Sequence, residues 1–334
     1  MEHAFEKKSS SGIERDSRYY SYILQYRNKI LKSQTHHYIT TVLVDCPAIS
    51  RLDIIRGCCG NLWNGTFISM STHRGVVHCG RGGAAAAQPL AVSAALSILQ
   101  KGGSFIDAGI ACSAVFAVVE PDSSHIGGDA FLVTHLSSTK ENLAFNGSGE
   151  APSGSNSHEF ADGIPFHGFK SATVPGLVST WFAAHDRYGK MSLQDILMPA
   201  INYAENGFPA NAHFVRGMRL HMAQYPDSTI FTDMGISATI NVGDIVVQKN
   251  LAQTLKAIVE EGRAAFYQGS IALKLISASD GWISADDLSS HYTRISEPLC
   301  VAYRELNVYG QPPPSQGMIL MQELLLADKV DLKR

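Results

Sequence analysis

The pattern of apolar and polar positions sharpens after Val76 and predicts two successive helices. The first begins at Pro89, a residue that the first helical turn tolerates, carries apolar residues at helical spacing, and ends at Gly102. The second runs to Val119, with Asp107 as its capping residue. Because the second helix is apolar on nearly every side, we expect it to be buried in the core.

The rest of the chain continues as short strands and further helices. Strands are predicted at residues 130–135, 143–146, 299–303 and 306–309. Helices are predicted at residues 175–188, 192–206, 210–222, 251–261, 271–279 and 316–327. Together these elements indicate an α+β fold in which helices are layered on a sheet. Such a fold is compatible with many functions, so the pattern alone does not indicate an activity.

Composition and charge narrow the classes of protein that fit. With 45% hydrophobic and 17% charged residues over 334 positions, the chain can fold around a sizeable core. Its 27 basic and 30 acidic side chains give a formal charge of −3 without a basic stripe, so a nucleic-acid partner is not expected. Apolar runs such as residues 110–119 are too short to cross a bilayer, so no membrane segment is expected. The sequence does not indicate the cellular compartment of the protein.

The residue types that bind metal ions or nucleotides show no recognisable spacing. The six cysteines form no C-x-x-C pair and have no companion histidines at zinc-ligand spacing. His125, His135 and His185 also lack ligand spacing, so a metal site is not expected. Gly127-Gly128 lacks the strand and helix context of a nucleotide site and is interpreted as a tight turn that packs a neighbouring loop.

An ordered series of residue blocks resembles one enzyme family. The blocks include residues 89–91, 101–103, 106–108, 119–131, 174–176, 207–209 and 312–317. The block at 119–131, V-E-P-D-S-S-H-I-G-G-D-A-F, is similar to the family pattern V-V-E-P-x-S-S-G-I-G-G-x-x-F. This family is the γ-glutamyltransferases with their acylase-like relatives, and the resemblance runs from Arg74 to Arg334. One motif alone would be weak evidence, but an ordered series over most of the chain is specific.

The resemblance implies both a fold and a chemistry. The family folds as the four-layer αββα sandwich of N-terminal-nucleophile hydrolases, and its precursor cuts itself into a large and a small subunit. The new N-terminal Thr of the small subunit attacks an amide carbonyl with its own α-amine as the base, and the acyl group then passes to water or to an amine. The implied substrate is a γ-glutamyl or related acyl amide such as glutathione, and no cofactor is implied.

The chain matches the large-subunit part of this family. Residues 74–334 are assigned to the large-subunit region, and residues 1–73 to a divergent N-terminal extension without assigned chemistry. The nucleophilic Thr of the family lies well after the block at 312–317, so it is expected beyond Arg334, and the αββα sandwich is expected to be incomplete. Loss of such a nucleophile costs about 10⁶ in turnover. This chain alone is therefore predicted to be inactive and to need a small-subunit-like segment or chain as its partner.

Residues 40–45 offer an alternative position for the nucleophile. Their sequence, T-T-V-L-V-D, resembles the start of the family's small subunit, so self-cleavage before Thr40 or Thr41 would expose an N-terminal Thr. The flanking Cys46-Pro47-Ala48 does not match that start, and Thr and Val favour strands in any fold. We therefore interpret this run as an ordinary strand.

The substrate pocket is expected around residues 145–152, which read F-N-G-S-G-E-A-P. The γ-glutamyl enzymes carry an Arg in F-R-E-x-A-P that holds the glutamyl α-carboxylate, and Ser148 stands at that position here. The form N-G-S-G-x-A-P resembles the acylase-like branch, which often has Arg where Glu150 stands, and a Glu there is expected to repel a carboxylate. The substrate-binding candidates are Asn146, Ser148, Glu150 and Asp129.

Two functional hypotheses stay open at this point. The first is an enzyme of the family, completed by a second segment. The alternative is a non-enzymatic or truncated relative that acts as a binding or interaction protein. A downstream Thr followed by a strand would favour the enzyme, and a stop codon directly after Arg334 would favour the alternative.

Overall fold

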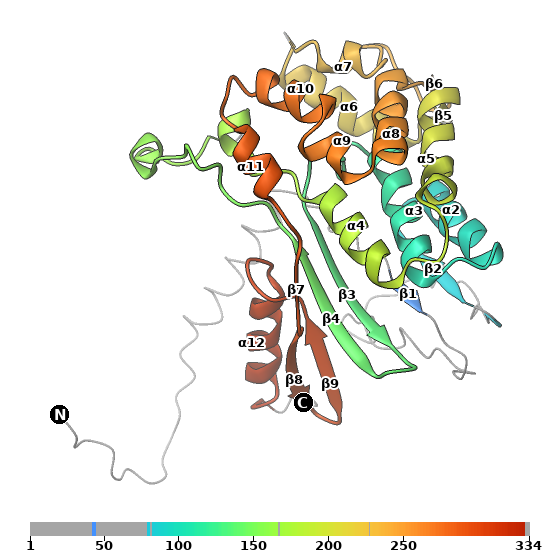
Figure 1. The fold of residues 1–334 in the computed structure, drawn as a ribbon, viewed down its shortest axis with the longest axis vertical. Helices are drawn as coiled ribbons and strands as arrows, with labels where there is room; N and C mark the ends of the chain where they lie inside the picture. Colours follow the sequence, from blue (N-terminus) through green and yellow to red (C-terminus); the bar gives the residue numbers. More distant parts are fainter. Residues whose placement is uncertain (1–41, 45–78, 81, 166–167, 227, 331–334) are drawn as a thin grey trace, which may run out of the picture. The chain divides into compact units, whose positions relative to one another are not determined.

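The sheet that carries the candidate site consists of three antiparallel strands (Figure 1). The computed structural model describes residues 42–44, 79–80, 82–165, 168–226 and 228–330. Strands β3 (Ala130–Leu136) and β4 (Glu141–Gly147) form a hairpin, and β7 (Arg294–Ser296) pairs with the other edge of β4. Directly opposed residues share a face, so the register places Phe131, Asn146 and Arg294 on one face of the sheet.

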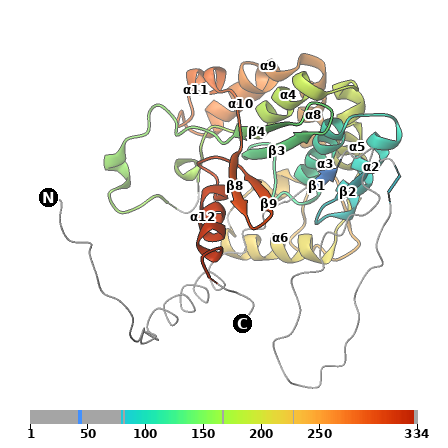
Figure 2. The same cartoon turned by 90° about the horizontal axis from the view of Figure 1, so that it is seen from below.

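Helices cover the opposite face of this sheet. Helix α4 (Leu177–Tyr188) contacts β3 and β4 and lies beside them in both views (Figure 1 and Figure 2). Phe145, which points away from the face of Asn146, is fully buried with its ring centroid 6.4 Å from that of Tyr188. On the face of Asn146, by contrast, Phe131 and Val133 stay 45% and 41% exposed.

The helical part of the core is built around α3 (Phe105–Val119), which contacts α2 (Pro89–Gln100), α4 and α5 (Leu193–Asn206). Helix α3 is buried along almost its whole length, as its apolar composition predicts. Helix α8 (Lys249–Glu261) also packs on α5. Burial of these helices against one another explains why their small and apolar residues recur at helical spacing.

The predicted helices and strands are present within a few residues of their expected bounds, and the mixture of helix and sheet confirms the α+β class. Further helices are α6 (Ala212–Gln224), α7 (Ile230–Asp233), α9 (Arg263–Tyr267), α10 (Ser270–Ala278), α11 (Ala285–Ser290) and α12 (Gly317–Ala327). Further strands pair two by two: β1 (Val42–Val44) with β2 (Gly83–Ala85), β5 (Phe208–Pro209) with β6 (Ile245–Val246), and β8 (Leu299–Tyr303) with β9 (Leu306–Gly310). Elements such as β7, α7 and α11 are absent from the sequence-based prediction because they are too short to show a period.

Asp107 takes part in capping α3, as predicted, but it stands at the third helical position of a capping box and not at the N-cap. Ser104 is the N-cap of α3: its Oγ accepts a hydrogen bond from the N–H of Asp107 at 3.0 Å, and Asp107 Oδ2 accepts one from the N–H of Ser104 at 2.8 Å. The fully buried Asp107 also accepts hydrogen bonds from the N–H groups of Lys190 and Met191, at 3.0 and 3.2 Å from Oδ2. Its carboxylate therefore ties the start of α3 to the segment between α4 and α5.

Two sequence-based expectations concern residues outside the described part of the chain. The extension at residues 1–73 is described only over β1, so the division at residue 74 stays a prediction. Thr40 and Thr41 also lie outside the described residues, whereas Val42–Val44 forms the strand that its composition predicts. Where the structure describes the chain, no helix has both the length and the apolar character needed to cross a bilayer.

Candidate functional site

The predicted substrate-binding residues meet at the end of the β3–β4 hairpin. Asp129 directly precedes β3, and its Oδ1 accepts a hydrogen bond from the N–H of Gly149, two residues after β4, at 3.1 Å. Asn146 Oδ1 accepts hydrogen bonds from the N–H and the hydroxyl of Ser148, at 3.0 and 2.7 Å. The structure therefore brings Asp129, Asn146 and Ser148 together in one hydrogen-bonded loop cluster, which we call the hairpin-end cluster.

The fourth candidate, Glu150, is paired with a residue that the sequence did not indicate. Its carboxylate forms an ion pair with the guanidinium of Arg294 on β7. The side chain of Glu150 is 61% exposed and that of Arg294 is 60% exposed. Glu150 was expected to repel a carboxylate, but the guanidinium beside it offsets that charge. Arg294 lies 144 residues away along the chain and reaches the cluster because it stands opposite Asn146 in the sheet.

Four of the family-like blocks converge on the hairpin-end cluster through backbone hydrogen bonds. The carbonyl oxygen of Gly128 accepts from the N–H groups of Gly176 and Leu177 at 3.0 and 2.9 Å. The N–H of Val174 donates to the carbonyl oxygen of Glu150 at 3.0 Å, and Asn146 Nδ2 donates to the carbonyl oxygen of Pro313 at 3.2 Å. The blocks at 119–131, 145–152, 174–176 and 312–317 therefore lie side by side in space.

The glycines of the N-G-S-G stretch are needed for this close approach. A Cβ at Gly149 would overlap the carbonyl group of Val174, and a Cβ at Gly147 would overlap the hydroxyl oxygen of Thr180. Gly127-Gly128 behaves as predicted, since the N–H of Gly128 closes a turn onto the carbonyl oxygen of His125 at 3.0 Å. These glycines therefore let one loop pack directly on the backbone of the next.

The surroundings shift the pKa values of two titratable groups, Asp129 in the cluster and His125 beside it. Asp129 reaches solvent, but enclosing protein atoms desolvate it and raise its pKa, while the N–H of Gly149 and the nearby His125 act in the opposite direction. Desolvation likewise lowers the pKa of His125, and the charge of Asp129 opposes this shift. The carboxyl of Asp129 in the cluster and the imidazole of His125 beside it therefore both reach solvent, and desolvation favours the neutral form of each relative to the free group.

A buried aromatic residue that lies in a family-like block, but was not among the predicted site residues, supports the cluster. The hydroxyl of Tyr267 donates to the carbonyl oxygen of Pro175 at 2.8 Å and accepts from the N–H of Ser179 at 3.0 Å, and burial raises its pKa. The ring of His291 stacks on that of Tyr267 with centroids 5.6 Å apart, and Arg263 Cζ lies 4.4 Å from the Tyr267 ring centroid. Desolvation, followed by the charge of Arg263, lowers the pKa of His291.

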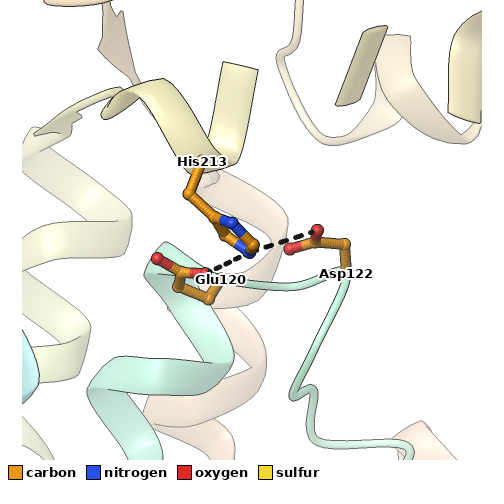
Figure 3. A group of neighbouring side chains, drawn as sticks. All are labelled: Glu120, Asp122 and His213. Atoms are coloured by element: carbon orange, nitrogen blue, oxygen red, sulfur yellow. Dashed lines mark ion pairs between the residues drawn. The ribbon is translucent and has the colours of Figure 1, made fainter. Parts of the chain in front are cut away.

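One group of residues in the described part of the chain could hold a metal ion: Glu120, Asp122 and His213 (Figure 3). The three histidines considered from the sequence do not belong to it. His185 instead lies within 2.8 Å of the carbonyl oxygen of Met191 through its Nε2, in keeping with a packing role. The group was missed because His213 lies on α6, far along the chain from Glu120 and Asp122, so the three residues show no ligand spacing.

Comparisons with known proteins agree with the family-like blocks. The profile of the family described as Gamma-glutamyltranspeptidase matches residues 91–334. A glutathione hydrolase-like proenzyme, YwrD of Bacillus subtilis, is 38% identical over 254 residues, which are 72% of this chain and 48% of that protein. Among solved structures, the γ-glutamyltranspeptidase of Helicobacter pylori has a TM-score of 0.70 at 30% identity and covers 74% of both chains. A cephalosporin acylase from Bacillus halodurans has a TM-score of 0.69 at 30% identity, over 74% of this chain and 49% of that one.

Proposed function

The chain belongs to the γ-glutamyltranspeptidase family, and we propose that it supplies the large-subunit part of an enzyme that hydrolyses or transfers a γ-glutamyl or related acyl amide, such as glutathione. The chain spans about half the length of the curated relatives it matches. We assign residues 74–334 to the large-subunit region. In this proposal the nucleophilic Thr is supplied by a small-subunit-like segment or by a second chain.

The observation that carries this proposal is the convergence of four family-like blocks on the hairpin-end cluster. Asp129, Asn146 and Ser148 supply a carboxyl, an amide and a hydroxyl within one hydrogen-bonded loop. These groups can bind the polar atoms of an acyl amide, whose orientation determines whether a nucleophile reaches the carbonyl carbon. A scaffold role alone would not require donors and acceptors to be gathered at the mouth of the hairpin.

The exposed face of the sheet supports the four-layer αββα arrangement. Helix α4 already covers Phe145 on one face, whereas Phe131 and Val133 on the other face remain open. A second sheet from the completing polypeptide would bury these apolar side chains. Because Asn146 and Arg294 project from that same face, a nucleophile carried by the second sheet would lie beside the hairpin-end cluster.

The proposed chemistry assigns binding and orientation to this chain. The Thr hydroxyl adds to the amide carbonyl while the Thr α-amine takes its proton, the amine product leaves with that proton, and water or another amine releases the acyl group. Ser148 stands where γ-glutamyl enzymes carry Arg, and the guanidinium of Arg294 on β7 can provide positive charge for a substrate carboxylate. Glu150 competes for that guanidinium, so Arg294 binds a substrate carboxylate by exchanging partners.

Expression of the complete open reading frame tests this proposal. Its product is purified, its N-termini are sequenced, and release of nitroaniline from γ-glutamyl-p-nitroanilide is measured with and without an acceptor dipeptide. We expect two chains, one beginning with Thr, and nitroaniline release that the separate 334-residue chain does not show. A product that stays uncut and releases no nitroaniline from γ-glutamyl or other acyl anilides would overturn the proposal.

A further inference from the structure

Three side chains of metal-ligand type meet where α3 ends and α6 begins. Glu120 directly follows α3, Asp122 comes two residues later, and His213 is the second residue of α6. Asn211, the N-cap of α6, donates its Nδ2 to Glu120 Oε1 at 3.2 Å. This bond fixes the start of α6 against the end of α3, so the three side chains are held together by the fold.

The atoms of this group are almost at the separations that a bound ion requires. Glu120 Oε2 lies 3.2 Å from His213 Nε2, and Asp122 Oδ2 lies 4.0 Å from the same nitrogen. All three ligand atoms lie within 4.8 Å of one another. Ligands about 2.0–2.2 Å from a tetrahedral zinc ion are roughly 3.3–3.6 Å apart. Side-chain shifts of about 1 Å would therefore complete the coordination.

Burial makes two neighbouring carboxylates costly without a cation. The side chains of Glu120 and Asp122 are only 9% and 10% exposed, and that of His213 is 30% exposed. Asp122 Oδ1 is fully buried and has no hydrogen-bond partner among the described residues. The carboxylate of Asp122 is directed toward His213 (Figure 3). A buried carboxylate with one oxygen lacking a donor is unfavourable, and a cation between the three groups would offset its charge.

Helix α6 leaves room for this carboxylate. Gly217 stands one turn after His213, and a Cβ there would overlap Asp122 Oδ2. A side chain at this position would push Asp122 away from the imidazole. The absence of a side chain therefore keeps the carboxylate and the imidazole on the same side of the helix.

We propose that Glu120, Asp122 and His213 bind one divalent first-row metal ion of the zinc type. An imidazole with two carboxylates suits such an ion, whereas Ca²⁺ and Mg²⁺ prefer oxygen ligands alone. Two carboxylates and one neutral imidazole balance the charge of the ion, and water takes the remaining position. The ion fastens the start of the segment that runs from Pro121 to Asp129, and so positions the hairpin-end cluster without contacting the substrate.

Metal titration of the full 334-residue chain tests the site. The chain is treated with a chelator, dialysed, and titrated first with Co²⁺ and then with Zn²⁺. We expect one Co²⁺ per chain with visible d–d absorption, its displacement by Zn²⁺, and a rise in Tm of about 5 °C at a hundredfold excess of Zn²⁺ over its Kd. His213→Gln and Asp122→Asn should each weaken binding at least about tenfold. The matched control His221→Gln, in the last turn of the same helix, should bind as the parent does.

A second measurement needs no substitution and covers the case in which a variant fails to fold. Diethylpyrocarbonate modifies accessible imidazoles, and trypsin places His213 in residues 191–216 and His221 in residues 220–249, each as the sole histidine of its peptide. Zn²⁺ should protect His213 and leave His221 reactive. The proposal is overturned by absence of one-to-one binding tighter than about 10⁻⁴ M, by unchanged binding in a folded His213→Gln variant, or by equal modification of His213 with and without Zn²⁺. Any of these results would leave the group as a hydrogen-bonded ion pair only.

Discussion

The N–H of Val174 donates a hydrogen bond to the carbonyl oxygen of Glu150 at 3.0 Å. This bond presses Gly149 against the backbone of Val174, where no side chain fits. The contact joins the loop that carries three of the substrate-binding candidates to the start of α4. The geometry of the hairpin-end cluster therefore depends on a glycine that itself contributes no functional group.

Gly149→Ala tests this dependence. The added Cβ would overlap the carbonyl of Val174, so we expect a loss of about 1–3 kcal/mol in the free energy of unfolding, as for other overpacked sites. Urea unfolding measures the loss. Gly154→Ala is the matched control, because nothing lies within 4 Å of a Cβ at that position. Equal stability of the two variants would contradict the role assigned to Gly149.

Replacing Asp107 with Ala should destabilise the helical core. The substitution removes the acceptor for the N–H groups of Ser104, Lys190 and Met191, and we expect a loss of about 2–4 kcal/mol. Asp107→Asn keeps one oxygen acceptor and should lose less. Asp195→Ala, at an exposed site in the first turn of α5, serves as the control and should cost under about 1 kcal/mol. Thermal and urea unfolding of the three variants would rank them, and a ranking with Asp195→Ala lowest in stability would refute this account.

Acidification should destabilise the chain partly through His291. The folded state lowers the pKa of this buried imidazole below its ordinary value of 6.5, so the unfolded state binds more protons as the pH falls through 6.5. The contribution of His291 to stability is therefore complete well above pH 6.5 and is lost as the pH falls toward the folded pKa. We expect His291→Gln to reduce the loss of unfolding free energy between pH 7.5 and 5.5. His135→Gln, at an exposed site, is the matched control; if the His291→Gln variant keeps the slope of the parent and of this control, the assignment to His291 fails.

Arg294 and Glu150 should influence substrate binding in opposite directions in the complete enzyme. Arg294→Gln removes the guanidinium and should raise KM about threefold for an acyl donor with a free carboxylate, the modest size reflecting the exposure of the pair. Glu150→Gln removes the competing carboxylate and should lower KM for the same donor. A donor that lacks the carboxylate is the control, and equal changes with both donors would mean that neither residue senses the carboxylate.

Short-range patterns in the sequence account for the parts of the fold and site that could be predicted. The segments around Asp129 and Asn146 could be placed close together because alternation and turn signals indicate a hairpin between them. Helix α3 could be predicted as buried because it lacks a polar face. The predicted cap of that helix was nevertheless displaced, since Ser104 and Asp107 share the capping box and either type can stand at the N-cap.

The parts of the fold and the site that could not be predicted depend on contacts between segments that are distant in the sequence. Arg294 sits on a strand of three residues, too short to show alternation, and its partner Glu150 is 144 residues away. The bond between Asn211 and Glu120, which brings His213 to Asp122, spans 91 residues. Neither contact leaves a local signal, because each depends on how the helices pack rather than on spacing within one element.

The strand order β3–β4–β7 also has a consequence during synthesis on the ribosome. When β4 emerges, its hairpin partner β3 has already been made. Its other partner, β7, emerges only later, because Glu150 just after β4 and Arg294 on β7 are 144 residues apart. At a translation rate of about 5–20 residues per second, that edge of β4 waits roughly 7–30 seconds for β7. Throughout that interval its backbone N–H and C=O groups are open to pairing with a neighbouring nascent chain, so the yield of native protein should fall when many ribosomes translate the same message at once.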